Sequence, residues 1–240
     1  MEQDDISKFD VLILCGGFGK RLKKISQNCP KPMVEINGRP FLEILIEHIS
    51  SFGFRRYILC AGFKSDVIEQ YFQKKNDDNT YILSKEDKPL GTGGGIKKAE
   101  PYILGSTFIV LNGDSICRAN LNGFIEFHKS NNASISMAIT TIEDMSEYGS
   151  IVINDRLEID GFKEKSNHIK GQGLVNAGIY LFKKPILDQI PSGQKISLEK
   201  EILPSMIGQK FYGFRTTEKL YDIGTPQRLE ILRAHMKSTD

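Results

Sequence analysis

The chain has 240 residues and a formal net charge of +2, with 32 lysines and arginines against 30 aspartates and glutamates. This length can bury the core of a single α/β domain, so we expect one domain over residues 1–240. The nearly balanced charge creates no general attraction for nucleic acid or an acidic membrane, and neither is expected as a partner. The acidic start has no apolar signal region, and no stretch has the roughly 18 apolar residues of a membrane span, which predicts a cytoplasmic protein.

The first half of the sequence alternates between strand and helix patterns. The apolar run 9–14 predicts a buried parallel strand, and the helical spacing of apolar residues from Phe41 to Phe52 predicts a helix after Pro40. The following patterns predict a strand at 56–60, a helix at 64–74, a short strand at 81–84, a helix at 93–100 and a strand at 107–112. Such alternation is typical of a Rossmann-like α/β fold, a doubly wound and mostly parallel sheet flanked by helices.

The second half is more mixed. A helix is predicted at 121–131, strands at 134–141, 150–153, 174–182 and 210–216, and a final helix at 227–236. No proline- or serine-rich linker and no internal repeat divides the chain, which again favours one domain. In doubly wound sheets, ligands bind beyond the carboxyl ends of the strands, so the loops after residues 14 and 112 are expected to hold the functional residues.

A glycine-rich loop follows the first strand. Gly16, Gly17 and Gly19 leave the backbone N–H groups open to a phosphate, and Lys20 and Arg21 add positive charge. The spacing does not match the P-loop, because Arg21 stands where that motif has serine or threonine, and it does not match the dinucleotide-binding fingerprint either. Lys31 lies between two prolines that stiffen its backbone, which suits a fixed cation, although an exposed loop lysine is the alternative.

Two aspartates are candidate metal ligands. Asp114 follows the predicted strand 107–112, and Asp222 precedes a Gly-Thr-Pro turn, so both carboxylates are candidates for the same edge of the sheet. One or two carboxylates completed by phosphates and water are the usual ligands of Mg²⁺. The alternative is that Asp114 is a turn residue and Asp222 a helix-entry residue.

These features resemble the nucleotide-sugar pyrophosphorylases, or sugar-1-phosphate nucleotidyltransferases. The likeness rests on L-C-G-G-F-G-K-R-L at 14–22, P-K-P at 30–32, N-G-D at 112–114, F-K-E-K at 162–165, N-A-G-I-Y at 176–180 and D-I-G-T-P at 222–226, in family order along nearly the whole chain. The resemblance implies a Mg²⁺-dependent enzyme that joins a nucleoside triphosphate to a sugar 1-phosphate and releases pyrophosphate.

The resemblance also implies roles for individual residues. The catalytic residues are Arg21, Lys31 and Asp114, and the metal ligands are Asp114 and Asp222. The nucleotide would contact Leu14, Cys15, Gly16, Gly17, Gly19, Lys20, Glu86, Gly91, Thr92 and Asn112. The sugar phosphate would be bound by Gly149, Glu164, Lys165 and Asn176. Because a sugar phosphate is largely anionic at neutral pH, it can attack the α-phosphate without a general base, and no histidine is expected to act in the reaction.

The segment 84–94 resembles the base-reading loop of the branch that uses GTP. Guanine presents its N1–H and N2 amino donors side by side, and the Glu86 carboxylate is suited to accept both. The P-L-G-T-G-G segment at 89–94 and I-S-L-E-K-E at 196–201 are most similar to the D-glycero-α-D-manno-heptose 1-phosphate guanylyltransferases, whose GDP-heptose product serves cell-surface polysaccharide synthesis. Ala177 and Thr225 depart from that pattern, and Thr225 is closer to the hexose enzymes.

Several alternatives remain open from the sequence. A mannose-1-phosphate guanylyltransferase, or an enzyme that uses UTP, CTP or dTTP with a hexose 1-phosphate, shares most of these motifs. A non-catalytic regulatory subunit that binds nucleotide sugars would be expected to lack one of Arg21, Lys31, Asp114 and Asp222, which are all present. An NAD-dependent oxidoreductase is disfavoured by the glycine spacing. The sequence is compatible with a homo-oligomer and does not define one.

Overall fold

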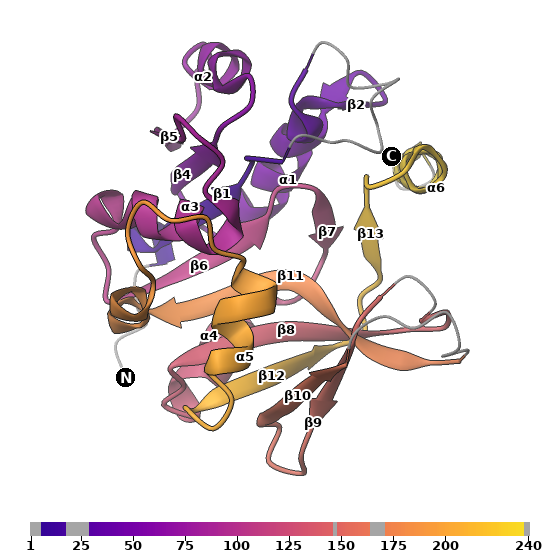
Figure 1. Cartoon of the computed structure of the whole chain (residues 1–240). Helices are drawn as coiled ribbons and strands as arrows, with labels where there is room; N and C mark the ends of the chain where they lie inside the picture. Colours follow the sequence, from indigo (N-terminus) through magenta and orange to yellow (C-terminus); the bar gives the residue numbers. More distant parts are fainter. Residues whose placement is uncertain (1–5, 18–28, 146–147, 164–170, 238–240) are drawn as a thin grey trace.

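The computed structural model describes residues 6–17, 29–145, 148–163 and 171–237. Within these residues a seven-stranded sheet forms the centre of the molecule, in the order β12-β8-β11-β6-β1-β4-β5 (Figure 1). Its strands are β1 (Asp10–Leu14), β4 (Arg56–Ala61), β5 (Thr80–Lys85), β6 (Thr107–Asn112), β8 (Ile135–Ile142), β11 (Gly173–Lys183) and β12 (Phe211–Thr216). Only β11 runs antiparallel to its neighbours, β6 and β8. The other pairs are parallel, which confirms the predicted mostly parallel, mixed sheet.

The helices and minor strands surround this sheet. The α-helices are α1 (Phe41–Ser50), α2 (Ser65–Phe72), α3 (Gly91–Ala99), α4 (Leu121–Ser130), α5 (Leu203–Ser205) and α6 (Pro226–Lys237). Short 3-10 helices cover Ile6–Lys8, Lys31–Met33, Glu100–Tyr102 and Lys184–Gln189, and Leu198–Ile202 is a π-helix. The described residues also form three antiparallel strand pairs: β2 (Glu35–Ile36) with β3 (Arg39–Pro40), β7 (Ser115–Cys117) with β13 (Leu220–Asp222), and β9 (Ser150–Ile153) with β10 (Ile159–Lys163).

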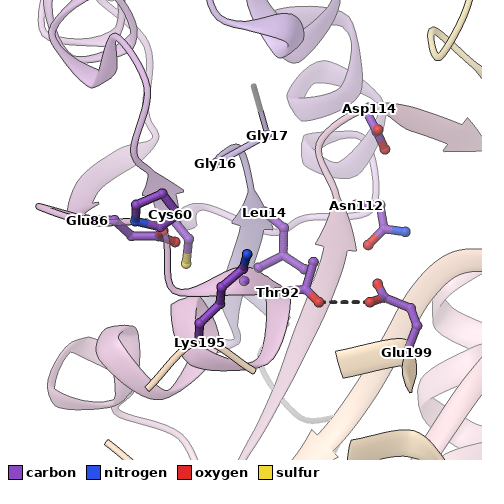
Figure 2. A pocket seen from close by; sticks show the side chains of 12 residues that line it. Leu14, Gly16, Gly17, Cys60, Glu86, Thr92, Asn112, Asp114, Lys195 and Glu199 are labelled. Carbon is purple, nitrogen blue, oxygen red and sulfur yellow. Dashed lines mark hydrogen bonds between the residues drawn. The ribbon is translucent and has the colours of Figure 1, made fainter. Parts of the chain in front are cut away.

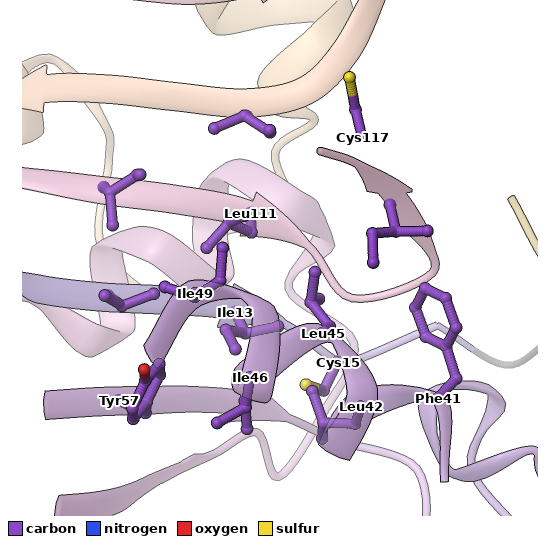
Figure 3. Close-up of a cluster of buried hydrophobic side chains, with 14 of the residues drawn as sticks. Ile13, Cys15, Phe41, Leu42, Leu45, Ile46, Ile49, Tyr57, Leu111 and Cys117 are labelled. Atoms are coloured by element: carbon purple, nitrogen blue, oxygen red, sulfur yellow. The ribbon is translucent and has the colours of Figure 1, made fainter. Parts of the chain in front are cut away.

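Alternate residues of each central strand enter separate apolar layers on the two faces of the sheet. In β1, Ile13 packs with α1, α2, α4 and α6 on one face, whereas Leu12 packs with α3 and the segment 186–206 on the other. Figure 3 shows the first layer, where Leu45 and Ile49 of α1 lie close to Ile13 and Leu111. Both faces are therefore covered, as the continuous apolar runs of the parallel strands require.

Each helix and strand predicted from its pattern is present, with ends that differ by at most two residues. The α3 helix was predicted to begin at residue 93. It begins at Gly91, so the glycine-rich segment 91–95 lies within the helix. The pairs β2–β3 and β7–β13 and the π-helix were not predicted, since two to five residues carry too little periodicity to be recognised. Among the described residues, no helix has the length and apolar character that a membrane crossing requires.

Candidate active site

A cavity of about 590 Å³ lies at the carboxyl ends of β1, β4 and β6. The described residues that line it come from segments far apart in the sequence, and Figure 2 shows how they surround a common space. They are Leu14, Gly16, Gly17, Cys60, Glu86, Pro89, Gly91, Thr92, Asn112, Asp114, Lys195 and Glu199. The cavity therefore has the location that the doubly wound fold predicts for a ligand.

The loop after β1 forms one wall. Gly16 and Gly17 both line the cavity, and a Cβ atom on Gly16 would come within 3.3 Å of Oε1 of Glu86, so a side chain at position 16 would crowd that carboxylate. A Cβ atom on Gly17 would meet nothing within 4 Å. The predicted residues Gly19, Lys20 and Arg21 lie outside the described residues. The described part of the loop thus exposes backbone at the cavity wall.

Glu86 lies at the wall formed by the end of β5. The Leu90 N–H donates to Oε2 of Glu86 at 3.0 Å, and a Cβ atom on Gly95 would lie only 2.7 Å from Oε1. Burial raises the pKa of the Glu86 carboxyl, while the Leu90 N–H and the charge of Lys98 act in the opposite direction. The surrounding glycines thus allow a partly buried carboxylate to face the cavity, where it can accept hydrogen bonds from a ligand.

Asp114 gives the cavity a polar end, and Lys31, which is not among the described lining residues, is paired with it. Lys31 begins the 3-10 turn that follows Pro30, and its Nζ donates to Oδ2 of Asp114 at 2.5 Å across 83 positions of sequence. The Lys31 side chain is 12% exposed and that of Asp114 is 45% exposed. Gly113, next to Asp114, packs closely on the end of β1, because a Cβ atom there would lie 2.7 Å from the Leu14 carbonyl oxygen. The structure therefore brings the predicted cation and the predicted acid together.

Asp222 ends β13, directly beside the Asp114 segment. Asp222 is paired with Ser115 in the β7–β13 ladder, and the Ile223 N–H donates to the Asp114 carbonyl oxygen at 3.0 Å. Asp222 is thus a strand-end residue and not the helix-entry residue of the alternative interpretation. Among the described residues that line the cavity, Asp114 is present and Asp222 is not.

The Asp222 carboxylate is fixed by several donors. The Gly224 N–H donates to Oδ1 at 2.7 Å, while the Tyr148 hydroxyl and an Arg228 N–H each donate to Oδ2 at 2.8 Å. The Arg228 guanidinium also lies over the Tyr148 ring, 4.7 Å from its centre. This network holds the Asp222 carboxylate in one orientation.

The two aspartates are suited to a hard divalent cation. In the described part of the chain, no group of three or more histidines, cysteines and acids could hold a metal by itself. A Mg²⁺ ion is commonly bound by one or two carboxylates and completed by substrate phosphates and water, and adjacent Asp114 and Asp222 match that donor set.

A second cavity of about 620 Å³ lies beside the first. Gly149 and Asn176, which were predicted to bind the sugar phosphate, both line it, whereas Glu164 and Lys165 lie outside the described residues. Asn176 is fixed in place because its amide donates to the Tyr180 hydroxyl at 2.6 Å and its Oδ1 accepts from the Gly178 N–H at 2.8 Å. The full described lining is Gly149, Ser150, Ile151, Gly161, Phe162, Lys163, Asn176, Glu199, Lys200, Leu203, Pro204 and Ile207.

The remaining predicted nucleotide-binding residues differ in what they present to the first cavity. Leu14 and Gly91 line it, as does Asn112, whose Oδ1 is buried without a hydrogen-bond partner among the described residues. The Cys15 side chain instead belongs to the core, and burial raises the pKa of its thiol, so it can offer a ligand only its backbone. The Thr92 hydroxyl is already hydrogen-bonded to Leu198 and Glu199.

Some residues at these sites had no predicted role. Lys195 and Glu199 line the first cavity, and Tyr148 and Arg228 hold Asp222. Glu199 falls in the I-S-L-E-K-E segment noted for its likeness to the heptose enzymes, which was the only available signal. The histidines with large pKa shifts are structural: burial lowers the pKa of both His48 and His128 to about 4.

The fold and this pair of cavities define an α/β protein with two neighbouring cavities, the first of them at the carboxyl edge of its sheet. The family model described as nucleotidyl transferase matches residues 10–240, and the chain belongs to this family. The predicted family is confirmed.

Curated relatives cover nearly the same length. The chain is 34% identical over 218 residues to the D-glycero-alpha-D-manno-heptose 1-phosphate guanylyltransferase of Aneurinibacillus thermoaerophilus, covering 90% of this chain and 94% of that protein. The enzyme of that name from Campylobacter jejuni is 34% identical, with 90% and 95% covered. The mannose-1-phosphate guanylyltransferase of Mycobacterium tuberculosis is 32% identical over 91% of this chain, which spans only 62% of that longer protein.

Solved structures agree with these relatives. HddC from Yersinia pseudotuberculosis superimposes with a TM-score of 0.85 at 35% identity, covering 95% of this chain and 99% of that one. The same protein complexed with GMP-PN gives a TM-score of 0.84 at 34% identity, with 95% and 99% covered. A UDP-glucose pyrophosphorylase complexed with UDP-glucose, at 18% identity and a TM-score of 0.82, shares the fold.

Proposed function

We propose that this chain, acting as a single domain, transfers GMP from GTP to a sugar 1-phosphate and releases pyrophosphate. The proposal is carried by one cavity that brings together Gly16 and Gly17, the Glu86 carboxylate and Asp114, to which Lys31 donates a hydrogen bond. These groups are suited in turn to phosphates, to a metal-bound phosphate and to the donor edge of guanine. The guanylyltransferase names of the relatives and the GMP-PN complex of HddC support the choice of base.

The arrangement suits a direct displacement. A phosphate oxygen of the sugar 1-phosphate forms a bond to the α-phosphorus of GTP, and the bond from that phosphorus to the β-phosphate bridging oxygen breaks, so pyrophosphate leaves. The attacking oxygen is already anionic at neutral pH, because the second pKa of a phosphate monoester is about 6. No side chain needs to remove a proton, and the protein's task is to align two anions and neutralise the charge on the α-phosphate.

The neutralising groups would be Lys31, Arg21 and a Mg²⁺ ion held by Asp114 and Asp222. When bound, Mg²⁺ would supply positive charge to the phosphate oxygens. The Lys31 ammonium is held next to Asp114 by the hydrogen bond between them. Arg21, Gly19 and Lys20 would extend the loop after β1 along the triphosphate.

For the acceptor we propose D-glycero-α-D-manno-heptose 1-phosphate, bound in the second cavity by Gly149 and Asn176 together with Glu164 and Lys165. The two heptose enzymes match this chain over 94–95% of their own lengths, which supports heptose over mannose. The GDP-heptose product would serve cell-surface polysaccharide synthesis, and we place the reaction in the cytoplasm, where GTP is available.

The test is pyrophosphate release by purified protein with Mg²⁺, using GTP, UTP and dTTP against heptose, mannose and glucose 1-phosphates. We expect kcat/KM to be highest for GTP with the heptose and about 100-fold lower for UTP, because uracil offers one donor where guanine offers two. Asp114→Ala and Asp222→Ala should each abolish turnover while retaining the wild-type circular dichroism spectrum. Comparable rates with GTP and UTP would reject the proposed preference for GTP. Faster turnover of mannose 1-phosphate than of the heptose 1-phosphate would show that mannose 1-phosphate is the acceptor.

A further inference from the structure

Glu199 lies at the junction of the two cavities. It is the second residue of the π-helix Leu198–Ile202. It lines both the cavity that contains Glu86 and the cavity that contains Asn176. Figure 2 shows its carboxylate on the same side of the space as the Asn112 side chain, with its link to Thr92 drawn. A group at this position can contact a ligand in either cavity.

The Glu199 side chain is held in a fixed orientation. The Thr92 hydroxyl donates to its Oε2 at 2.8 Å across 107 positions of sequence, and the Ser197 hydroxyl donates to the same oxygen at 3.1 Å. The Thr92 oxygen also accepts from the Leu198 N–H at 2.8 Å, so its hydroxyl both donates and accepts within this network. Thr92 therefore acts on the wall of the cavity by positioning Glu199.

The backbone beneath this network is tightly docked on α3. The Ile196 N–H donates to the Leu90 carbonyl oxygen at 2.8 Å, and the Ile196 carbonyl oxygen accepts from the Gly93 N–H at 2.9 Å. Gly91 has a φ of +71°, and a Cβ atom there would lie 2.4 Å from the Ile196 oxygen. The position of Glu199 is thus set by close contacts with the start of α3.

The chemistry of the Glu199 carboxylate restricts its ligand. Within the described ranges, it forms no ion pair with a lysine, arginine or histidine, and both of its hydrogen bonds end on Oε2. Oε1 remains able to accept. A fixed, unpaired carboxylate repels a phosphate and favours hydroxyl donors, so its ligand is the polyol part of a substrate.

The neighbours of Glu199 indicate that this polyol is the sugar of the acceptor and not the ribose of the nucleotide. Tyr180, whose hydroxyl accepts from Asn176, has a pKa raised first by burial and then by the charge of Glu199. Glu199 also lines the second cavity together with Asn176. This shared lining makes the carboxylate accessible from the cavity proposed for the sugar.

We propose that Glu199 binds the sugar 1-phosphate by accepting hydrogen bonds from its ring hydroxyls, and that Thr92 positions Glu199 for this contact. The inference rests on the proposed function for the identity of the substrate. It assigns the selection of the acceptor to a residue on the π-helix, in addition to those on the strands around Gly149 and Asn176.

The test compares Glu199→Gln with the wild type by measuring KM separately for the sugar 1-phosphate and for GTP. We expect KM for the sugar 1-phosphate to rise about 10- to 100-fold, since a charge-assisted hydrogen bond is weakened, while KM for GTP stays within about twofold. Thr92→Val should raise the sugar KM in the same way by about fivefold, and Thr92→Ser, which keeps the hydroxyl, should restore it. Glu126→Gln, at an exposed acid of α4 outside both described linings, is the control and should change neither constant.

A substrate analogue makes the assignment specific to hydroxyls. If Glu199 accepts from one ring hydroxyl, the corresponding deoxysugar 1-phosphate should have nearly equal KM values for the wild type and for Glu199→Gln. An unchanged sugar KM in Glu199→Gln, or an equal rise in KM for GTP, would overturn the proposal. Calorimetric titration of the wild type and of Glu199→Gln with the sugar 1-phosphate measures the same contact without turnover. Absence of pyrophosphate release would reject the proposed function. The Glu199 contact would then still be tested by the two binding constants.

Discussion

We propose that the Glu86 carboxylate selects the base of the nucleotide. Its Oε2 accepts from the Leu90 N–H, while glycines at 16 and 95 leave room around Oε1. A glutamine at this position would keep one acceptor and turn an amino group toward the cavity, where it would oppose the guanine donors. The same amide can pair with the adjacent acceptor and donor of uracil.

The Glu86→Gln variant should therefore lose kcat/KM for GTP by about 10- to 100-fold, the effect of one charge-assisted hydrogen bond, and lose less for UTP. Steady-state kinetics with both nucleotides measure the ratio. Glu69→Gln, at an acid of α2 outside the described lining of the cavity, provides the control. A GTP-to-UTP ratio equal to that of the wild type would show that Glu86 does not read the base.

Site residues that follow strand ends or belong to motifs could be predicted from the sequence. Site residues that are positioned by a partner far away in the sequence could not. Lys31, Glu86 and Asp114 were recognised because strand ends and motifs point to them, and all three line or adjoin the first cavity. Glu199 acquires its place from Thr92, 107 positions away, and no local pattern encodes that contact. Cys15 was predicted to contact the nucleotide, and its thiol lies in the core, so such a contact would have to come from its backbone.

Glycines of α3 allow the segment 194–199 to pack closely against this helix, and Gly91 makes the shortest approach. Gly91→Ala would place a methyl group against the Ile196 carbonyl in a backbone region that favours glycine. We expect a loss of about 2 kcal/mol or more in the free energy of unfolding, together with a raised KM for the sugar phosphate as Glu199 shifts.

Urea denaturation of Gly91→Ala and of Gly161→Ala measures this effect. A Cβ atom at Gly161 would meet nothing within 4 Å, so that variant should remain within about 1 kcal/mol of the wild type. Equal stability of the two variants would contradict the close docking of residues 194–199 on α3.

Elements with long apolar runs were predicted, and those without them were not. The strand 107–112 was predicted with its exact bounds, because six residues with a buried centre are bounded by turn residues on both sides. The β7–β13 pair, which brings Asp222 next to Asp114, joins two three-residue strands separated by about a hundred positions. Its pairing arises from the closed tertiary structure and has no signal in either segment alone.

For the whole molecule, the buried His128 and the partly buried His48 make stability depend on pH. His128 is 2% exposed, its Nδ1 lies 2.9 Å from the Ser136 hydroxyl, and burial, with the charges of Lys183 and Lys129, lowers its pKa to about 4. Its unfolded pKa is about 6.5, so the unfolded chain takes up a proton first as the pH falls. The contribution of neutral His128 is therefore present above pH 6.5 and is lost as the pH falls toward 4.

Between pH 7 and pH 5 this residue alone should cost about 2 kcal/mol in the free energy of unfolding, and His48 should act in the same direction. Urea denaturation of the wild type and of His128→Asn at both pH values gives the two slopes. We expect the variant to lose about 2 kcal/mol less than the wild type over this interval. Parallel losses would mean that His128 takes up its proton in the folded protein.

The mostly parallel sheet was predicted from the alternation of strands and helices, and the same architecture brings residues 14, 86, 112 and 114 to one edge. We propose that a sugar phosphate is joined to the α-phosphate of GTP at that edge. Phosphorus NMR of a reaction with Mg²⁺, GTP and D-glycero-α-D-manno-heptose 1-phosphate is the decisive measurement. We expect equal amounts of pyrophosphate and of a GDP-sugar with two coupled diphosphate signals. Formation of GDP and inorganic phosphate, or the absence of any product with each sugar 1-phosphate tried, would contradict it.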